Sequence, residues 1–151
     1  TMGTELGAIT IKLEADLSPI AVGNFAALVD CGYYDGIVFH RVVPEFVIQG
    51  GDPDGSGAGG PGYEIQDEPV TATYERGVVA MARTAQPNSV GSQFFIVLDD
   101  KAQGSLASAN TYQIIGHVTA GMEVADAITA AADRENPTDP VAMTTVTIAS
   151  P

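Results

Sequence analysis

One stretch decides what this sequence is expected to fold into, Phe39-His40-Arg41-Val42-Val43-Pro44-Glu45-Phe46-Val47-Ile48-Gln49-Gly50-Gly51-Asp52-Pro53. Two short apolar runs flank a proline turn, which predicts a pair of strands. Because side chains alternate along a strand, Arg41 shares one face with Phe39 and Val43. After the turn, Phe46 and Gln49 return within reach of that face. The stretch therefore predicts a guanidinium beside an aromatic ring and an amide; the alternative is that Arg41 only pairs with an acid at a barrel rim.

A second stretch combines polar and aromatic residues in the same way, Met81-Ala82-Arg83-Thr84-Ala85-Gln86-Pro87-Asn88-Ser89-Val90-Gly91-Ser92-Gln93-Phe94-Phe95-Ile96. A polar loop leads into a strand with two adjacent aromatic residues. Alternation places Phe94 and Phe95 on opposite faces, so that one ring packs in the core and the other faces a groove. The alternative is that both rings serve ordinary core packing.

Alternating and periodic apolar residues predict the remaining elements. Ser18 and Pro19 are expected to begin a helix, with Ser18 as its N-cap, and Gly32 to end it. A second helix is expected over residues 121–131. Strands are expected over residues 6–14, 37–43, 46–49, 62–66, 78–82, 92–98, 112–119 and 141–149. This pattern predicts a mainly β fold, a closed eight-stranded antiparallel β-barrel capped by two α-helices, as a single domain over residues 1–151.

The charge balance excludes several partners. Only 6 Lys and Arg stand against 19 Asp and Glu, a formal net charge of −13 in 151 residues. Nucleic-acid binding is not expected, because phosphate contacts need clustered cations. No apolar run reaches 18 residues, so no direct membrane insertion by this chain is expected. Cytoplasmic and extracytoplasmic locations both stay open, since a targeting segment upstream of Thr1 could have been removed.

Cofactor and metal motifs fail on inspection. Gly55-Ser56-Gly57-Ala58-Gly59-Gly60 matches G-x-G-x-x-G, but Pro61-Gly62 follows it where a dinucleotide site needs a helix. His40 and His117 are the only histidines and are expected to be satisfied structural residues. Cys31 is the only cysteine and is expected to be a buried, inert thiol. No cofactor and no metal are therefore expected.

Together the two stretches resemble the cyclophilins, a family of peptidyl-prolyl cis/trans isomerases. The resemblance lies in F-H-R-V-V-P-x-F-V-I-Q-G-G-D, G-x-G-x-G-G-P-G-Y and G-S-Q-F-F-I. It runs from Leu6 to about Ile148, and the Met-Ala-Arg-Thr form of the second stretch looks bacterial or bacterial-like. The family's eight-stranded barrel with two capping helices is consistent with the predicted elements.

The resemblance implies roles for several residues. Arg41 matches the catalytic arginine of the family, and Phe46 matches an aromatic residue at the floor of the proline pocket. Gln49 matches a glutamine that contacts both the substrate backbone and the arginine. The other implied substrate-binding residues are Val47, which stands where methionine is usual, Phe95 as the second pocket aromatic, Gln93 in the neighbouring groove, and Ala82, Arg83 and Ala85 beside the residues that precede the proline. Gly57 lies near the mouth of the adjoining pocket.

Two departures alter the expected rim of the pocket. The chain has no Trp, although the family commonly has Trp or another aromatic residue before a leucine in the loop that precedes the Tyr112 strand. Leu106 is the expected equivalent of that leucine, in a loop of altered length over residues 103–111. Tyr112 stands where a histidine is frequent. The resemblance therefore implies an intact proline pocket with a changed rim, which places tight cyclosporin binding in doubt.

The expected reaction is rotation about X–Pro peptide bonds, which must overcome a barrier of about 18–20 kcal/mol because amide resonance is lost. It needs no nucleophile, acid or metal, and a guanidinium can donate to the prolyl nitrogen as its lone pair becomes localised. The expected partners are proline-containing peptides and unfolded protein chains, with the enzyme a monomer that assists protein folding. A prolyl-peptide binding or chaperone module with weak catalysis is the alternative, and a small-ligand barrel is a further one. Arg41 and Arg83 also predict a locally less negative groove.

Overall fold

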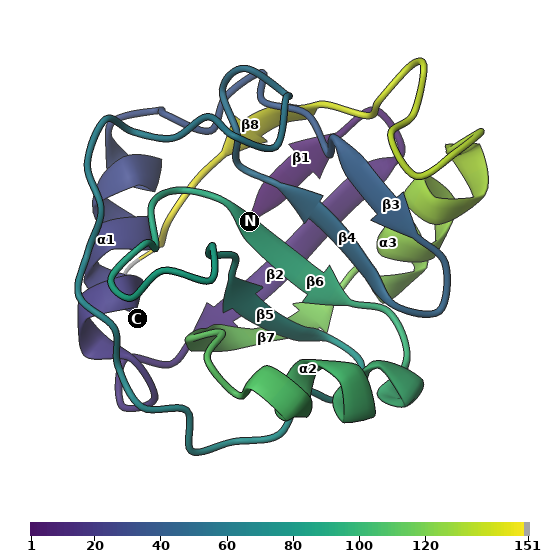
Figure 1. Cartoon of the computed structure of the whole chain (residues 1–151). Coiled ribbons are helices and arrows are strands. Elements are labelled where there is room, and N and C mark those ends of the chain that lie inside the picture. Colours follow the sequence, from purple (N-terminus) through teal and green to yellow (C-terminus); the bar gives the residue numbers. More distant parts are fainter. Residues whose placement is uncertain (150–151) are drawn as a thin grey trace.

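Eight antiparallel strands form one curled sheet in the computed structural model, which describes residues 1–149 (Figure 1). The order across the sheet is β3-β4-β6-β5-β7-β2-β1-β8. The strands are β1 (Met2–Thr4), β2 (Gly7–Leu13), β3 (Arg41–Val43), β4 (Val47–Gly50), β5 (Val78–Met81), β6 (Phe94–Val97), β7 (Ile114–Ala120) and β8 (Met143–Val146). The helices are α1 (Pro19–Asp30), α2 (Gln103–Ala109) and α3 (Met122–Ala131), with a 3₁₀ turn, η1 (Asp100–Ala102), leading into α2.

The sheet is open, so the expected closed barrel is wrong. Its two edges, β3 and β8, do not pair with each other. The chain just before β3 reaches the start of β8 through hydrogen bonds of Gly36 and Ile37 with Met143 and a bridge between Val38 and Ala142. Beside β3 runs the connection from α3 to β8, whose Glu135 carbonyl accepts from the Val42 N–H. This connection contains two prolines, which have no N–H to offer a strand ladder, so the molecule is a half-barrel.

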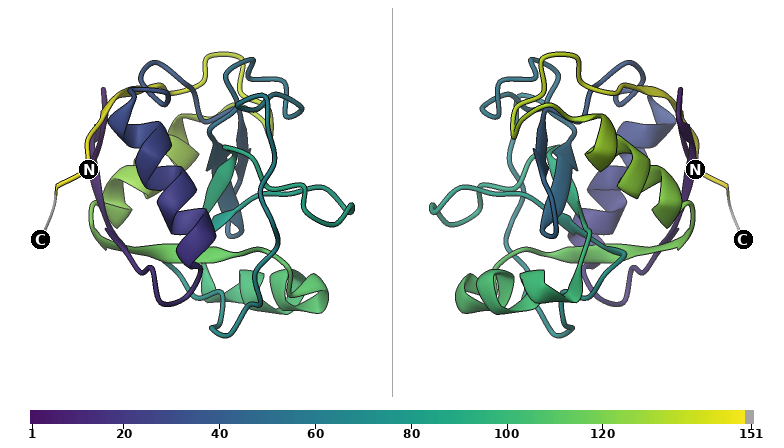
Figure 2. Two further views of the ribbon diagram at one scale, coloured as in Figure 1. Left: turned by 90° about the vertical axis from the view of Figure 1, so that its left-hand side faces the viewer. Right: turned by 90° about the vertical axis from the view of Figure 1, so that its right-hand side faces the viewer.

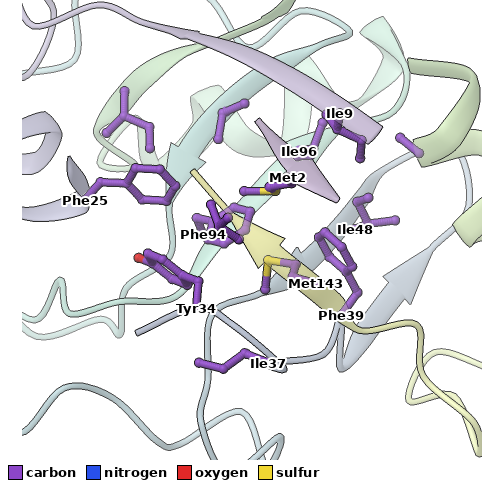
Figure 3. Packing of buried hydrophobic residues seen from close by; sticks show 14 of the residues in the cluster. Met2, Ile9, Phe25, Tyr34, Ile37, Phe39, Ile48, Phe94, Ile96 and Met143 are labelled. Carbon is purple, nitrogen blue, oxygen red and sulfur yellow. The ribbon is translucent and has the colours of Figure 1, made fainter. Parts of the chain in front are cut away.

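The concave face of the sheet holds the main core (Figure 3). Phe25 from α1 packs against Tyr34 and Phe94, and the ring of Phe39 stands edge-on to Phe94. Helices α1 and α3, whose ribbons Figure 2 shows from two sides, both contribute residues to this cluster. Because bulky side chains fill the interior, the small-ligand barrel is excluded.

A second apolar cluster lies on the convex face. Its buried members are Val47, Tyr74, Ala80, Phe95, Val97, Ala102, Leu106 and Ile114. Alternation explains the division, because Phe94 is buried in the first cluster and its neighbour Phe95 in the second. Helix α2 and η1 cover this face through Leu106 and Ala102. Helix α2 is a third α-helix, where the sequence predicted a loop over residues 103–111.

Helix α1 begins at the expected proline, but its cap differs from the prediction. Ser18 is buried at the N-cap position and its side chain makes no capping hydrogen bond. Instead, the two carboxylate oxygens of Glu68 accept from the N–H groups of Ile20 and Ala21, each at 2.9 Å. A negative charge there also complements the helix dipole. The cap therefore comes from a residue 48 positions away from Ile20, which no local pattern reveals.

Two further expectations are corrected. Residues 62–66 form no strand and contribute only a bridge between Ile65 and Val90, whereas the unpredicted β1 supplies the eighth strand. Cys31 is exposed rather than buried, and its Sγ donates to the carbonyl of Leu28. No helix among the described residues is both long and apolar enough to cross a membrane.

Candidate active site

Strand pairing brings three of the predicted site residues, Arg41, Gln49 and Phe95, into one row across the sheet. Arg41 on β3 lies opposite Gln49 on β4, and Gln49 lies opposite Phe95 on β6. Phe95 in turn lies opposite Ala80 on β5. Directly opposite residues in antiparallel strands have Cβ atoms about 4.5–5.5 Å apart and point to the same face. The register therefore sets a cation, an amide and an aromatic ring side by side on the convex face.

The Arg41 guanidinium has partners at two of its nitrogens. Its Nε donates to Glu135 Oε1 at 2.7 Å, and its Nη1 makes a long hydrogen bond of 3.5 Å to Gln49 Oε1. The Arg41 side chain is 35% exposed. Both interpretations of the sequence are thus met in part, because Arg41 pairs with an acid and also stands beside the predicted amide.

A chain of side-chain amides orients Gln49. The Nε2 of Gln93 donates to the carbonyls of Gly57 and Gly59, at 3.1 and 2.9 Å, so that its Oε1 faces Gln49. This Oε1 accepts from the Nε2 of Gln49 at 3.0 Å. The carbonyl oxygen of Gln49 is consequently the end that turns to Arg41. The glycine loop thus fixes the polarity of both amides.

The loop itself is built around Asp52, whose side chain is buried. Its carboxylate accepts from the backbone N–H groups of Asp54, Gly57 and Gly59 and from the Ser56 hydroxyl. Burial acts to raise the pKa of Asp52, but these hydrogen bonds outweigh it and leave the pKa below its usual value. A Cβ on Gly59 would come within 2.0 Å of Asp52 Oδ1, so this close approach requires glycine.

The predicted apolar residues gather on the other side of Gln49. Phe95 is buried, and its ring packs edge-on against Tyr112 with centroids 5.4 Å apart. Val47 and Leu106 belong to the same cluster, and Phe46 packs against it with part of its ring exposed. Leu106 on α2 is thus a buried member of the apolar cluster that contains Phe95.

Tyr74 holds the wall of this cluster in place. Its hydroxyl donates to the Tyr112 carbonyl at 3.0 Å and accepts from the Tyr112 N–H at 3.1 Å. Burial raises the pKa of Tyr74 to about 12, so the hydroxyl stays protonated and keeps its role as donor. The position of Tyr112 is therefore fixed through its backbone, and its ring is free to face Phe95.

A polar cavity of about 570 Å³ lies beside this cluster rather than above the Phe95 ring. Five of the predicted residues line it, namely Gln49, Gly57, Ala82, Arg83 and Gln93. Ala85 does not; it is exposed on the loop between β5 and β6, and Thr84 and Ser89 take part in the lining instead. Figure 2 shows this loop, in teal to green, projecting from the body of the molecule. Ala82 and Gln49 connect the polar cavity with the apolar cluster.

Arg83 is not a free cation in the groove. Its Nη1 lies 2.8 Å from Asp67 Oδ1, and the side chain is only 8% exposed. Its Nη2 donates to the carbonyl of Gln86. Since Arg41 is paired with Glu135 as well, the expected locally less negative groove is not supported by unpaired cations.

The two histidines differ from each other. His117 is satisfied as expected, because its Nδ1 lies 2.9 Å from Glu14 Oε2. His40 is buried next to Arg41 with no hydrogen-bond partner on either ring nitrogen, so it is not a satisfied histidine. Burial lowers the pKa of His40, which favours the neutral ring. Within residues 1–149, no group of three or more His, Cys, Asp or Glu side chains is arranged to hold a metal ion.

Sequence reasoning missed Glu135 and the lining residues around residues 59–64. Glu135 lies 94 positions from Arg41 in a connection without periodicity, so no local signal identifies it. All of these lining residues except Glu64 lie within the G-x-G-x-G-G-P-G-Y motif, which was a usable signal for them.

Comparisons with known proteins agree over nearly the whole chain. A family model described as cyclophilin type peptidyl-prolyl cis-trans isomerase/CLD matches residues 1–148. Peptidyl-prolyl cis-trans isomerase B of Bacillus subtilis is 44% identical over 119 residues, which cover 78% of this chain and 80% of that protein. A peptidyl-prolyl cis-trans isomerase of Arabidopsis thaliana is 42% identical over 130 residues, 82% of this chain and 76% of the relative.

Other matches extend this picture. A longer protein of Streptococcus pyogenes is 50% identical over 105 residues, and the match spans 67% of this chain and only 22% of that protein. Among solved structures, a cyclophilin type isomerase of Cryptosporidium parvum, crystallised in the presence of the dipeptide Ala-Pro, has a TM-score of 0.86 at 33% identity. The likeness covers 99% of this chain and 98% of the other.

Proposed function

The chain belongs to the cyclophilin-type peptidyl-prolyl cis-trans isomerase family, and from this premise we propose that it accelerates cis/trans rotation about X–Pro bonds in peptides and unfolded protein chains. The observation that carries the proposal is the row of Arg41, Gln49 and Phe95 on adjacent strands. It sets a fixed guanidinium next to an apolar surface, which is what a reaction without bond making or breaking needs.

Arg41 is the proposed catalytic residue. In the twisted transition state the prolyl nitrogen gains a localised lone pair that the planar ground state lacks, so a donor placed there stabilises the transition state selectively. Its Nη2 has no hydrogen-bond partner among the described residues and is available to donate. An arginine suits this role because it stays charged and presents a rigid fork of N–H groups.

The surrounding residues bind the peptide in this proposal. The prolyl ring packs against Phe46, Phe95 and Tyr112, with Val47 and Leu106 behind them. One charge-assisted hydrogen bond contributes about 1.5–3 kcal/mol, whereas a 10⁵-fold acceleration requires about 7 kcal/mol. Gripping the flanking backbone in the cavity lined by Gln49, Gly57, Ala82, Arg83 and Gln93 supplies a further part of the difference.

Two-dimensional exchange NMR on a short X–Pro peptide tests this function. We expect the wild type to accelerate exchange and Arg41→Ala to slow it by about 10²-fold or more, given the 1.5–3 kcal/mol of the lost bond and the loss of orientation. Circular dichroism should show an unchanged fold, because Arg41 is half-buried at a sheet edge. Full activity of Arg41→Ala would rule out the arginine mechanism.

The second candidate is a prolyl-peptide binding or chaperone module with weak catalysis. The observation in its favour is the altered rim, where Leu106 on helix α2 packs in the same buried cluster as Phe95 in a chain without Trp. The same NMR experiment separates the two. Peptide shifts on titration without accelerated exchange would support the binding module, and accelerated exchange supports the isomerase.

A further inference from the structure

Glu135 approaches the proposed catalytic group from outside the sheet. It lies in the connection between α3 and β8, and its Oε1 accepts from Arg41 Nε at 2.7 Å. We propose that Glu135 is a positioning residue, which fixes the orientation of the Arg41 guanidinium before a peptide binds. The inference rests on the isomerase function proposed above and adds an acidic residue that acts through the arginine.

The backbone around Glu135 is held against β3 on both sides. The Glu135 carbonyl accepts from the Val42 N–H at 2.7 Å, and the side chain of Asn136 donates to the His40 carbonyl at 3.2 Å. The loop is also closed on itself, because Asp133 accepts from the N–H and the hydroxyl of Thr138. These contacts flank Arg41 in sequence, so the Glu135 side chain starts from a fixed point next to the guanidinium.

The two side-chain contacts of Arg41 come from opposite sides of the edge strand β3, Gln49 from β4 and Glu135 from the connection between α3 and β8. Glu135 binds Nε, whereas Gln49 accepts from Nη1 at 3.5 Å, which is too long to hold the fork by itself. The shorter, charge-assisted contact therefore sets the orientation. Of the five N–H groups of the guanidinium, both on Nη2 and one on Nη1 have no partner within residues 1–149 and are available to the peptide.

Orientation matters here because an arginine side chain has many rotamers. If the guanidinium is already fixed, the loss of this freedom does not have to occur in the transition state. Glu135 cannot act by changing the charge of Arg41, because a guanidinium stays charged in proteins. Both side chains are partly exposed, 35% for Arg41 and 58% for Glu135, so the contact should weaken as salt screens it.

The test compares wild type, Glu135→Gln and Glu135→Ala by exchange NMR with an X–Pro peptide. We expect kcat to fall about fivefold in Glu135→Ala, which corresponds to about 1 kcal/mol, with KM nearly unchanged. Glu135→Gln keeps a hydrogen-bond acceptor without the charge, so its kcat should lie between those of the wild type and Glu135→Ala. High salt should narrow the gap between wild type and Glu135→Gln, and the Arg41 Nε–H resonance should move in both variants.

Three controls keep the inference falsifiable. Asp139→Asn removes an exposed charge from the same connection, where Asp139 forms no ion pair with a described residue, and should leave kcat unchanged. In an Arg41→Lys background, Glu135→Ala should have no further effect. Full kcat in Glu135→Ala, with Arg41→Ala inactive, would overturn the positioning role and leave the isomerase intact. A wild type that does not accelerate exchange would overturn both.

Discussion

Arg41 and the two glutamines beside it show how single residues share one task. A carboxamide looks symmetric, yet its two ends have opposite hydrogen-bonding character, so its polarity must be set by neighbours. Here the carbonyls of Gly57 and Gly59 fix the orientation of the Gln93 amide, and Gln93 fixes that of the Gln49 amide. Gln49 therefore presents its side-chain oxygen to Arg41. Loss of any of these hydrogen bonds should therefore change the contact between Gln49 and Arg41.

Gln93→Leu tests this relay at the residue scale. It removes the donor to two loop carbonyls and the acceptor for Gln49, so Gln49 is free to turn its NH₂ group toward Arg41. One lost partly buried hydrogen bond costs about 1–3 kcal/mol, so we expect kcat/KM to fall about tenfold in exchange NMR. Gln66→Leu is the matched control, an exposed glutamine outside the site, and should keep full activity. Equal activity of the two variants would refute the relay.

At the scale of elements, the glycine-rich loop over residues 52–59 matches a nucleotide-binding motif only by its spacing. In the structure it supports Gln93 in the candidate site. Its glycines serve a buried carboxylate, because Asp52 gathers three backbone N–H groups and a hydroxyl. The loop then presents two carbonyls to Gln93. The local pattern predicted a loop correctly. What the loop supports depends on Gln93, the residue just before β6, which the loop pattern does not contain.

Asp52→Asn should loosen this loop. The amide NH₂ would face backbone N–H donors, so we expect the unfolding free energy at pH 7 to drop by about 1–3 kcal/mol in urea titrations. The depressed pKa of Asp52 means that its contribution is present above the unfolded pKa of about 3.9 and is lost as pH falls through the lower folded pKa. The difference between wild type and variant should therefore shrink below pH 4. A difference that stays constant down to pH 2 would contradict this assignment.

The elements themselves were predicted unevenly. The alternating strand β2, the continuously apolar strand β6 and helices α1 and α3 appear where the pattern placed them, within a few residues. The pattern missed β1 and α2 and wrongly predicted a strand over residues 62–66. These three short segments are decided by what they pack against: β1 lies between β2 and β8, and α2 is held by Leu106 on the convex face.

At the scale of the whole molecule, every cation is compensated. All 6 Lys and Arg side chains lie within 4 Å of an acidic partner, and Lys101 and Glu45 are one such pair at the hairpin between β3 and β4. Most of the 19 acids have no such partner among the described residues. The long-range field of the protein is therefore negative.

This field predicts a salt dependence that differs between substrates. A peptide with lysines beside X–Pro should bind more tightly than one with glutamates at low salt. Since the Debye length falls from about 30 Å at 0.01 M to about 10 Å at 0.1 M, the two KM values should converge as salt rises, while kcat stays similar. Titrations followed by exchange NMR measure both constants. Identical KM values for the two peptides at 0.01 M salt would show that the field does not reach the groove.

The sequence by itself predicted the candidate site residues and the strands that carry them, although Phe39, expected on the face of Arg41, packs in the main core instead because β3 begins only at Arg41. Alternation separated Phe94 from Phe95, and the short turn at Pro44 returned Gln49 to Arg41, because side-chain direction in a strand and a tight turn are local properties of the backbone. Only the tertiary structure decided the long-range partners. Glu135 pairs with Arg41, Asp67 pairs with Arg83, and Glu68 caps helix α1. It also decided that the sheet is open rather than closed. Such contacts join segments far apart in the chain, and their partners are set by how the whole sheet curls, which no local pattern contains.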